Sequence, residues 1–324
     1  MKNRDNRRIN DRLLDHALGL LKKESRLEYV GEYGSEMMTF VPFVAWLKQE
    51  GHLRGRRIVS YNGMRPYYFF LDEDEFEEKD EPRRCLPVHE RYWPYCNEFD
   101  GVVNPWKVYI DYRGHYRSSQ SRGERPTLFV QNKFTVEWDV GPINYMPLYA
   151  LERLMDLTAD RYQVIYSCPR IPLSGYSDDH NSACHYPDRE IINRYNHVTD
   201  LEQSTLESGG DYNRTKLNLL ADAQVYVAVQ GGGANILPYF GGSVLFLLHQ
   251  KGREYPYTYK NGAYKSLSES PPELMLARNA KAFDKGLRVI EYLESVKGEL
   301  RLPSPYRLSS LPWSARKSII KLCS

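Results

Sequence analysis

Six consecutive residues late in the chain carry the clearest chemical signal. An apolar run at 225–229 leads into Gln-Gly-Gly-Gly-Ala-Asn at 230–235, and a second apolar run follows at 244–248. This pattern predicts a strand, a glycine turn, a short helix and another strand. Glycine permits close backbone approach to a ligand, and the N–H groups that begin a helix attract phosphate. The candidate phosphate-binding residues are therefore Gln230, Gly231, Gly232, Gly233 and Asn235.

Two basic residues are candidates to neutralise that phosphate. Lys133 follows the apolar run 127–130, and Arg170 follows Cys168 and Pro169 after a second run at 162–166. Ligands of open α/β sheets bind outside the carboxyl ends of the strands, where both residues are expected. The alternative for Lys133 is an ordinary position on the surface.

A polar and aromatic loop begins beside Lys133. It contains Asn132, Glu137, Trp138 and Asn144 within residues 132–144. Loops of this composition at strand ends suit sugars or nucleobases, because aromatic rings stack and amides form hydrogen bonds. A packed corner between two domains would have a similar composition.

The elements that would position these residues alternate between strand and helix. Strands are expected at 27–30, 58–61, 127–130, 162–166, 196–200, 225–229 and 244–248, and helices at 10–23, 37–49, 146–157, 212–221 and 272–296. The acidic run 72–81 is expected to be a solvated surface segment, and the polar stretch 117–126 a linker. The fold class is therefore α/β, with two Rossmann-like domains facing a cleft. The expected boundaries are 1–120, 121–300 and a tail at 301–324.

Composition limits the partners and the compartment. The 324 residues include 44 basic and 42 acidic side chains, a balance that does not favour nucleic acid as a partner. The 26 tyrosines suit a wet site for sugars or bases, or simply complete the core. Five cysteines without paired spacing predict neither a disulfide framework nor a zinc site. Without an apolar signal core or a membrane-spanning run, we expect a cytoplasmic protein.

The layout of residues 127–255 resembles the nucleotide-sugar-binding half of GT-B glycosyltransferases. The residues that carry the resemblance are Gln131-Asn132-Lys133, Arg170, Asp222 before the 225–229 run, the 230–235 turn, and Gly252-Arg253-Glu254. The resemblance implies transfer of a sugar from a nucleotide-sugar donor to a glycan or glycolipid hydroxyl. It also implies no cofactor and no obligatory metal, because basic side chains and helix N-termini stabilise the leaving pyrophosphate.

The resemblance also suggests roles for particular acidic residues. It places Glu254 where a carboxylate accepts hydrogen bonds from ribose or sugar hydroxyls, although Glu254 is equally suited to pairing with Arg253 or Lys251. The first domain should supply the acceptor side, and a general base there would take the hydroxyl proton. Glu36 is the first candidate and Glu32 the second, with helix capping at 35–36 as the structural alternative.

The segment 178–185 offers two further candidates for proton transfer. Asp179 and His185 are alternative catalytic bases, but the cluster matches no metal-ligand spacing, and no metal site is predicted. In the tail, residues 308–322 combine apolar and basic side chains, which suits peripheral contact with an anionic membrane or docking against the protein body.

Other functions differ in what they require. A nicotinamide oxidoreductase requires G-x-G-x-x-G, and a P-loop kinase requires G-x-x-x-x-G-K-[ST]; the chain has neither. A nucleotide-sugar epimerase of the same architecture remains an alternative, and so does a non-catalytic carbohydrate- or nucleotide-binding protein. An epimerase would need no second sugar substrate, and a binding protein would tolerate loss of Glu36.

Overall fold

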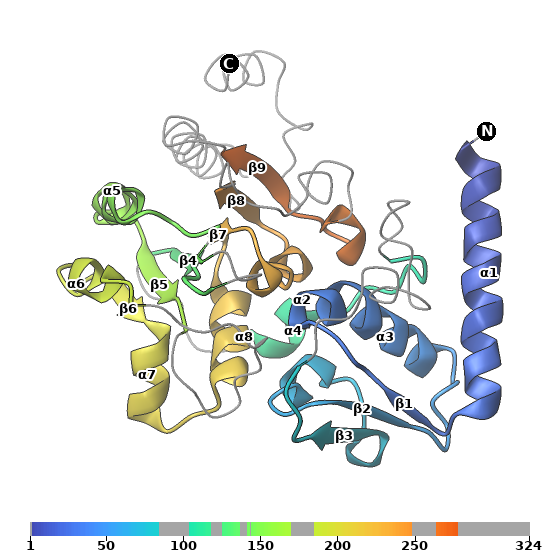
Figure 1. Cartoon of the computed structure of the whole chain (residues 1–324). Coiled ribbons are helices and arrows are strands. Elements are labelled where there is room, and N and C mark those ends of the chain that lie inside the picture. Colours follow the sequence, from blue (N-terminus) through green and yellow to red (C-terminus); the bar gives the residue numbers. More distant parts are fainter. Residues whose placement is uncertain are drawn as a thin grey trace.

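Two parallel sheets organise the part of the chain that the structure describes (Figure 1). The computed structural model describes residues 2–83, 104–117, 125–136, 141–142, 144–169, 185–247 and 264–277. The smaller sheet has the order β1-β2-β3, with β1 at Arg26–Glu28, β2 at Arg57–Tyr61 and β3 at Phe76–Lys79. The larger sheet contains β4 (Thr127–Gln131), β5 (Gln163–Ser167), β6 (Val198–Asp200), β7 (Val225–Val229), β8 (Ser243–Leu247) and β9 (Glu273–Ala277).

The strand order of the larger sheet is β6-β5-β4-β7-β8-β9. Counted from β4, this is the 3-2-1-4-5-6 order of a Rossmann fold, and all of its pairings are parallel. The strand order reverses between β4 and β7: β5 and β6 are added on one side of β4, and β7, β8 and β9 on the other. At this point Gln131 of β4 pairs with Ala228 of β7. The two strands therefore end level with each other, and the α/β class predicted from the sequence is confirmed.

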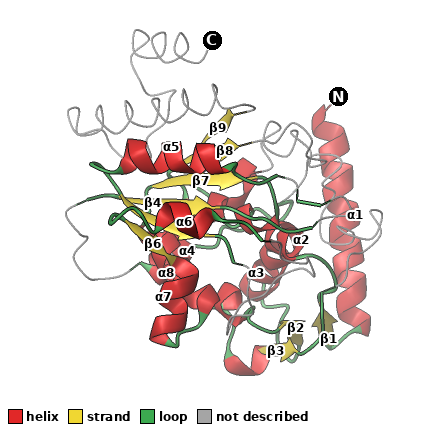
Figure 2. Cartoon of the chain, turned by 60° about the vertical axis from the view of Figure 1, so that its left-hand side comes forward, coloured by secondary structure: helices red, strands yellow, loops and turns green. Residues whose placement is uncertain are grey.

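Helices cover both faces of the larger sheet (Figure 2). The helices of the larger sheet are α5 (Leu148–Thr158), α6 (Asp188–Ile192), α7 (Leu201–Ser208) and α8 (Tyr212–Asp222). By contrast, α1 (Lys2–Lys23), α2 (Tyr33–Ser35) and α3 (Val41–Gln49) lie beside the smaller sheet, and α4 (Tyr112–Tyr116) contacts both halves. Successive strand residues point to opposite faces. Leu128 and Val130 pack with the α5 side chains, while Phe129 packs with those of α8. Aspartate side chains cap three of the described α-helices: Asp111 at α4, Asp200 at α7 and Asp211 at α8.

The face of the larger sheet that carries α8 shares one hydrophobic core with the smaller sheet. Phe129 and Tyr226 belong to the same buried cluster as Tyr29, Phe40 and Ile58. Direct hydrogen bonds join the two halves as well: the Tyr67 hydroxyl donates to Asn213 Oδ1 at 3.0 Å, and Asn213 Nδ2 donates to the Gly63 carbonyl at 2.8 Å. The two sheets are thus joined by a common interior, and the exact domain boundary near residue 120 stays a prediction.

The acidic run contains a strand, which corrects the expectation of a solvated segment. After a 3₁₀ turn at Glu73–Glu75, β3 pairs in parallel with β2 and buries Phe76 and Lys79. Its outward carboxylates are paired: Glu77 accepts from Arg26 at 2.7 Å and from Arg57 at 3.2 Å. Charged residues are common on edge strands, where they prevent further pairing. Because these residues are charged, the sequence pattern did not indicate a strand here.

The expected helix at 272–296 is also wrong at its start. Residues 273–277 form β9, which pairs in parallel with β8 from Ser243↔Glu273 to Leu247↔Ala277. Glu, Leu, Met and Ala all favour helices, but pairing with a neighbouring strand overrides propensity. Residues 278–296, the tail at 301–324 and most of the expected linker lie outside the described residues.

Candidate functional site

The end of β4 and the glycine turn after β7 meet at the point where the strand order reverses. Gly231 has φ +149° and ψ 171°, a conformation that is essentially restricted to glycine. A methyl group added there would lie 2.5 Å from Lys133 Nζ. The Lys133 ammonium therefore lies over the backbone of the turn, at the edge where Rossmann folds bind ligands.

The segment after the turn is shorter than the sequence suggested. Instead of a helix there are two 3₁₀ turns, Gly232–Ala234 and Leu237–Phe240. Pro238 lacks the N–H that a longer helix would need at its position. Turns this short carry little macrodipole, so the charge of Lys133 is the main described attraction for an anion here.

Asn132 is fully buried and holds the loop after β4 in place. Its Oδ1 accepts from the backbone N–H groups of Lys133 and Met146, both at 2.9 Å, and its Nδ2 donates to the Tyr166 hydroxyl at 2.8 Å. Both atoms of the amide thus already have hydrogen-bond partners within the protein. Its predicted contact with the donor stays a prediction, while its visible action is to position Lys133.

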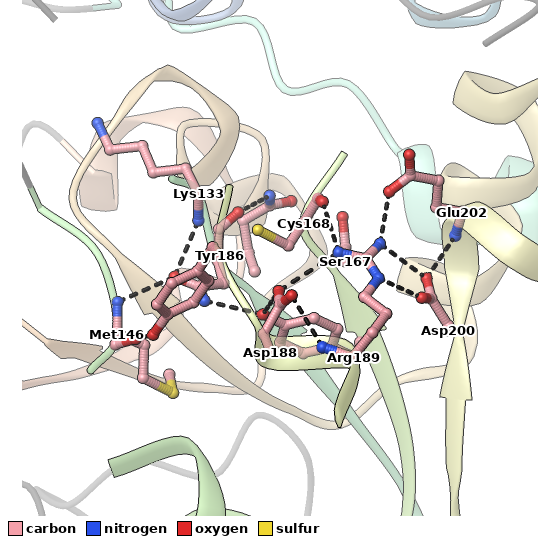
Figure 3. Close-up of polar contacts among 12 residues, drawn as sticks. Lys133, Met146, Ser167, Cys168, Tyr186, Asp188, Arg189, Asp200 and Glu202 are labelled. Carbon is pink, nitrogen blue, oxygen red and sulfur yellow. Dashed lines mark hydrogen bonds and ion pairs between the residues drawn. The ribbon is translucent and has the colours of Figure 1, made fainter. Parts of the chain in front are cut away.

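Behind Asn132 lies a polar network that the sequence analysis missed (Figure 3). The Tyr166 hydroxyl donates to Asp188 at 2.6 Å, and Arg189 donates to Asp200 at 2.6 Å and to Glu202 at 2.5 Å. Burial, together with the neighbouring Asp188 carboxylate, raises the pKa of Tyr166 well above its usual value, so it remains a donor. These residues are widely spaced, and no local pattern identifies them.

The network points inward, whereas Lys133 points away from it (Figure 3). Arg189 also donates to the Cys168 carbonyl at 3.1 Å, which ties the end of β5 to α6. The network therefore fixes the ends of β4, β5 and β6 relative to one another. It leaves the Lys133 side chain to extend toward the glycine turn.

The first β-to-α turn of the smaller sheet packs directly against the glycine turn. A methyl group on Gly34 would lie 2.7 Å from the Gly232 Cα, so glycine is required at this contact. Asn235 Nδ2 donates to the Gly34 carbonyl at 3.1 Å, and its Oδ1 accepts from the Tyr264 hydroxyl. Asn235 therefore joins the two halves, and its predicted contact with a nucleotide stays a prediction.

Glu36 is buried in an ion pair. Its Oε1 accepts from the Tyr68 hydroxyl at 2.7 Å and from Ser60, and its Oε2 lies 2.8 Å from Arg83 Nη1. Burial, with the Glu36 carboxylate nearby, raises the pKa of Tyr68 well above its usual value and keeps it protonated. Glu36 also begins a π-helical turn at Glu36–Phe40, between α2 and α3. The structure places it as a structural anchor, and its catalytic role stays a prediction.

Glu32 differs from Glu36 in its exposure. It is half-buried at the N-cap of α2, and its side chain forms no capping hydrogen bond. It stands two residues before Gly34, which touches the glycine turn. Of the two acidic residues predicted in this turn, Glu32 is the one with exposed surface.

The remaining predicted residues are only partly described. Gln230 is buried, with 2% of its surface exposed. His185 is exposed and precedes Tyr186, whose ring stacks on Phe134 with centroids 4.2 Å apart. Arg170, Asp179 and Glu254 lie outside the described residues, as do Glu137 and Trp138.

The described segments contain no group of three His, Cys, Asp or Glu side chains arranged as metal ligands. Among the same residues, no helix combines the length and apolar character needed to cross a bilayer.

No known protein-family model matches the chain, and no curated protein matches it in sequence. Several solved structures are similar in fold. The ADP-heptose LPS heptosyltransferase II of E. coli is 12% identical, covers 86% of this chain and 99% of its own, and has a TM-score of 0.48. E. coli heptosyltransferase WaaC with ADP is 11% identical, with coverages of 85% and 97% and a TM-score of 0.46.

A third solved structure, the iron-containing dodecameric glycosyltransferase TibC of enterotoxigenic E. coli, is 13% identical over 69% of this chain and 57% of its own, with a TM-score of 0.34. Each of these TM-scores is below 0.5. The α/β class of this chain therefore rests on its own strand order, and its function has to be inferred from the residues of the site.

Proposed function

We propose that this protein is a glycosyltransferase that moves a sugar from a nucleotide-sugar donor to a hydroxyl of a glycan or glycolipid. One observation carries the proposal: the Lys133 ammonium lies over Gly231, where the strand order of a Rossmann sheet reverses. The diphosphate of a nucleotide sugar would bind beside this cation. As the bond from the sugar C1 to the diphosphate oxygen breaks, negative charge develops on the diphosphate, and Lys133 stabilises it.

The acceptor would approach from the smaller sheet. Glu32 is our candidate general base there, because it is half-buried and stands two residues from the contact between Gly34 and Gly232. It would take the proton of the acceptor hydroxyl, whose oxygen forms the new bond to the sugar C1. The reaction needs no electron carrier, and we propose that it needs no obligatory metal because a protein cation neutralises the leaving group.

The first test is nucleotide binding, measured by thermal shift. A ligand that binds only the folded state stabilises it by about 2.7 kcal/mol at a concentration of 100 times its Kd. We expect one of ADP, UDP, GDP, CDP or TDP to raise the melting temperature of the wild-type chain, with or without EDTA. If EDTA abolishes the shift in melting temperature, the proposed metal independence is wrong. If NAD alone stabilises the chain, the proposed glycosyltransferase activity is wrong.

A pair of lysine variants localises the binding. Lys133→Ala should weaken nucleotide binding about tenfold or more, because a hydrogen bond to a charged group contributes about 1.5–3 kcal/mol. Lys22→Ala removes an exposed lysine at the end of α1 and should leave the affinity unchanged. Equal affinities for both variants would place the nucleotide elsewhere.

Turnover separates the transferase from its alternatives. A transferase releases nucleoside diphosphate from a nucleotide sugar when an acceptor is present. An epimerase converts the nucleotide sugar without an acceptor, and a binding protein leaves it unchanged.

A further inference from the structure

Two buried side-chain amides, Gln131 at the end of β4 and Asn144 in the segment before α5, have atoms without hydrogen-bond partners. Gln131 has 5% of its surface exposed and Asn144 has none. Gln131 Nε2 donates to the Asn132 carbonyl at 3.1 Å, but its Oε1 receives no donor, and neither Oδ1 nor Nδ2 of Asn144 has a partner. Leaving such a group unsatisfied destabilises the folded chain, and most buried polar atoms are therefore paired.

The backbone at Asn144 accounts for the residue type but not for its burial. Asn144 has φ +52°, in the left-handed region that asparagine tolerates better than other side chains. Glycine, or an asparagine with an exposed side chain, could adopt the same backbone conformation. The backbone therefore does not explain why the unsatisfied amide of Asn144 is buried.

Both amides are held beside the site already described. Asn132 lies between them along the chain, and its Oδ1 binds the Met146 N–H at 2.9 Å. Asn144 is two residues from Met146, hence within about 7 Å of it, because a residue spans at most about 3.6 Å. On the other side, a methyl group on Gly233 would lie 3.4 Å from Gln131 Nε2.

The missing partners define the chemistry of the ligand. Gln131 Oε1 and Asn144 Oδ1 accept hydrogen bonds, while Asn144 Nδ2 donates. An ionised phosphate offers only acceptors and would leave both oxygens unsatisfied. A sugar hydroxyl both donates and accepts, so neighbouring hydroxyls satisfy all three atoms. The half-exposed rings of Phe134 and Tyr145 lie on the same loop, and aromatic rings suit the apolar faces of sugars.

We propose that Gln131 and Asn144 bind hydroxyl groups of the sugar that the donor carries. This inference rests on the proposed function, since it assigns the sugar end of the donor whose diphosphate lies at Lys133. Asn144 is covered in the free chain, so it engages the sugar after a local change of side-chain conformation, as is common on binding. The two neutral amides thus select the sugar, and the cation holds the phosphate.

The test compares nucleotide sugars with their free nucleoside diphosphates. We would measure the Kd of UDP-glucose, GDP-mannose and ADP-glucose, each beside UDP, GDP or ADP, for the wild type, Gln131→Met and Asn144→Gly. Asn144→Gly keeps the left-handed backbone and removes the amide. Lys107→Gly is its matched control, because Lys107 also has a positive φ, of +55°, and is exposed outside the site.

For the pair in which the sugar increases affinity most, we expect each variant to weaken nucleotide-sugar binding about tenfold and to leave diphosphate binding within twofold of the wild type, in line with one or two lost hydrogen bonds. Equal losses for both ligands would show that the amides bind the base or ribose and would overturn the proposal. Unchanged binding, or no increase in affinity from any of the three sugars, would overturn it too.

A second measurement needs no ligand. If the amide is unsatisfied in the free chain, Asn144→Gly should lower the free energy of unfolding, relative to Lys107→Gly, by no more than the lost packing of one small buried side chain. A larger loss would show that the amide is already bonded, for instance to a buried water, and would overturn the proposal. Absence of any nucleotide binding by the wild type, with this stability result intact, would instead contradict the proposed function.

Discussion

The carboxyl edges of the two sheets differ in how their polar groups are satisfied. At the smaller sheet the charges are paired internally: Lys79 Nζ lies 2.6 Å from Glu28, and Arg83 lies 2.8 Å from Glu36. Both cations also lie 4.3 Å from the centroid of the Tyr61 ring, and these are the two closest cation–π contacts among the described residues. At the larger sheet, Gln131 and Asn144 keep buried atoms without partners.

The difference distinguishes a completed scaffold from a site that awaits a ligand. In the buried pair of Glu36 and Arg83 each charge already faces its countercharge, and such a pair is costly to disturb. Unsatisfied amides have the opposite property, because a ligand that bonds them removes an existing cost. We therefore expect substitution of the paired charges at the first edge to change stability most, and substitutions at the second edge to change binding most.

The largest expected effect separates the two acidic residues of the first edge. Glu32→Gln should lower kcat by about 10²–10⁴, the usual contribution of a general base, with little change in the free energy of unfolding. Glu36→Gln should mainly lower stability, because it leaves Arg83 buried without its countercharge. Steady-state kinetics and urea denaturation of both variants measure this. A fall in kcat for Glu36→Gln alone, with stability retained, would restore Glu36 as the base.

The next effect tests the ion pair itself. Arg83→Met should lower the free energy of unfolding by about 3–5 kcal/mol, because it leaves the Glu36 carboxylate buried and unpaired. The double variant Glu36→Gln with Arg83→Met should recover much of the loss. Arg26→Ala, which breaks the exposed pair with Glu77, should cost at most about 1 kcal/mol and is the control. A small effect of Arg83→Met in urea denaturation would mean that this edge is not a rigid scaffold.

The smallest effect on stability is expected at the second edge. Gly231→Ala should cost about 1–3 kcal/mol from its backbone conformation, and should also displace Lys133 and weaken nucleotide binding. Gly55→Ala is the control: Gly55 has φ +74° with no atom within 4 Å of an added methyl group, so it tests backbone strain alone. Titration calorimetry of both variants should show lost binding for Gly231→Ala only. If Gly231→Ala and Gly55→Ala bind the nucleotide with equal affinity, the glycine turn is not part of the nucleotide site.

The sequence predicted elements best where burial is complete. Strands buried on both faces read as continuous apolar runs, and the 225–229 run is β7 residue for residue. The meeting of Lys133 with the glycine turn also follows from the sequence, because parallel strands end at the same edge of a sheet. The turn itself was predicted, but the length of the helix after it was not.

The rest depends on partners that are distant in sequence. Glu36 and Arg83 are 47 positions apart, and no local spacing indicates that they meet. In β3, Glu77 pairs with arginines on β1 and β2, so its strand conformation comes from neighbours that the acidic run does not reveal. The positive φ of Asn144 is likewise visible only in the folded chain.

Arg113, in α4, ties the segment before the polar linker to the second half of the chain. It donates to the Phe240 carbonyl at 2.6 Å, the Ala223 carbonyl at 2.8 Å and the Tyr226 hydroxyl at 2.6 Å. On the same helix, the Tyr112 hydroxyl donates to the Tyr67 carbonyl of the first half at 2.6 Å. A fragment that begins after the linker would lose α4 and expose the tyrosine-lined interior that it covers. We therefore expect the two halves to unfold together, and a fragment of either half to be less stable alone than within the whole chain.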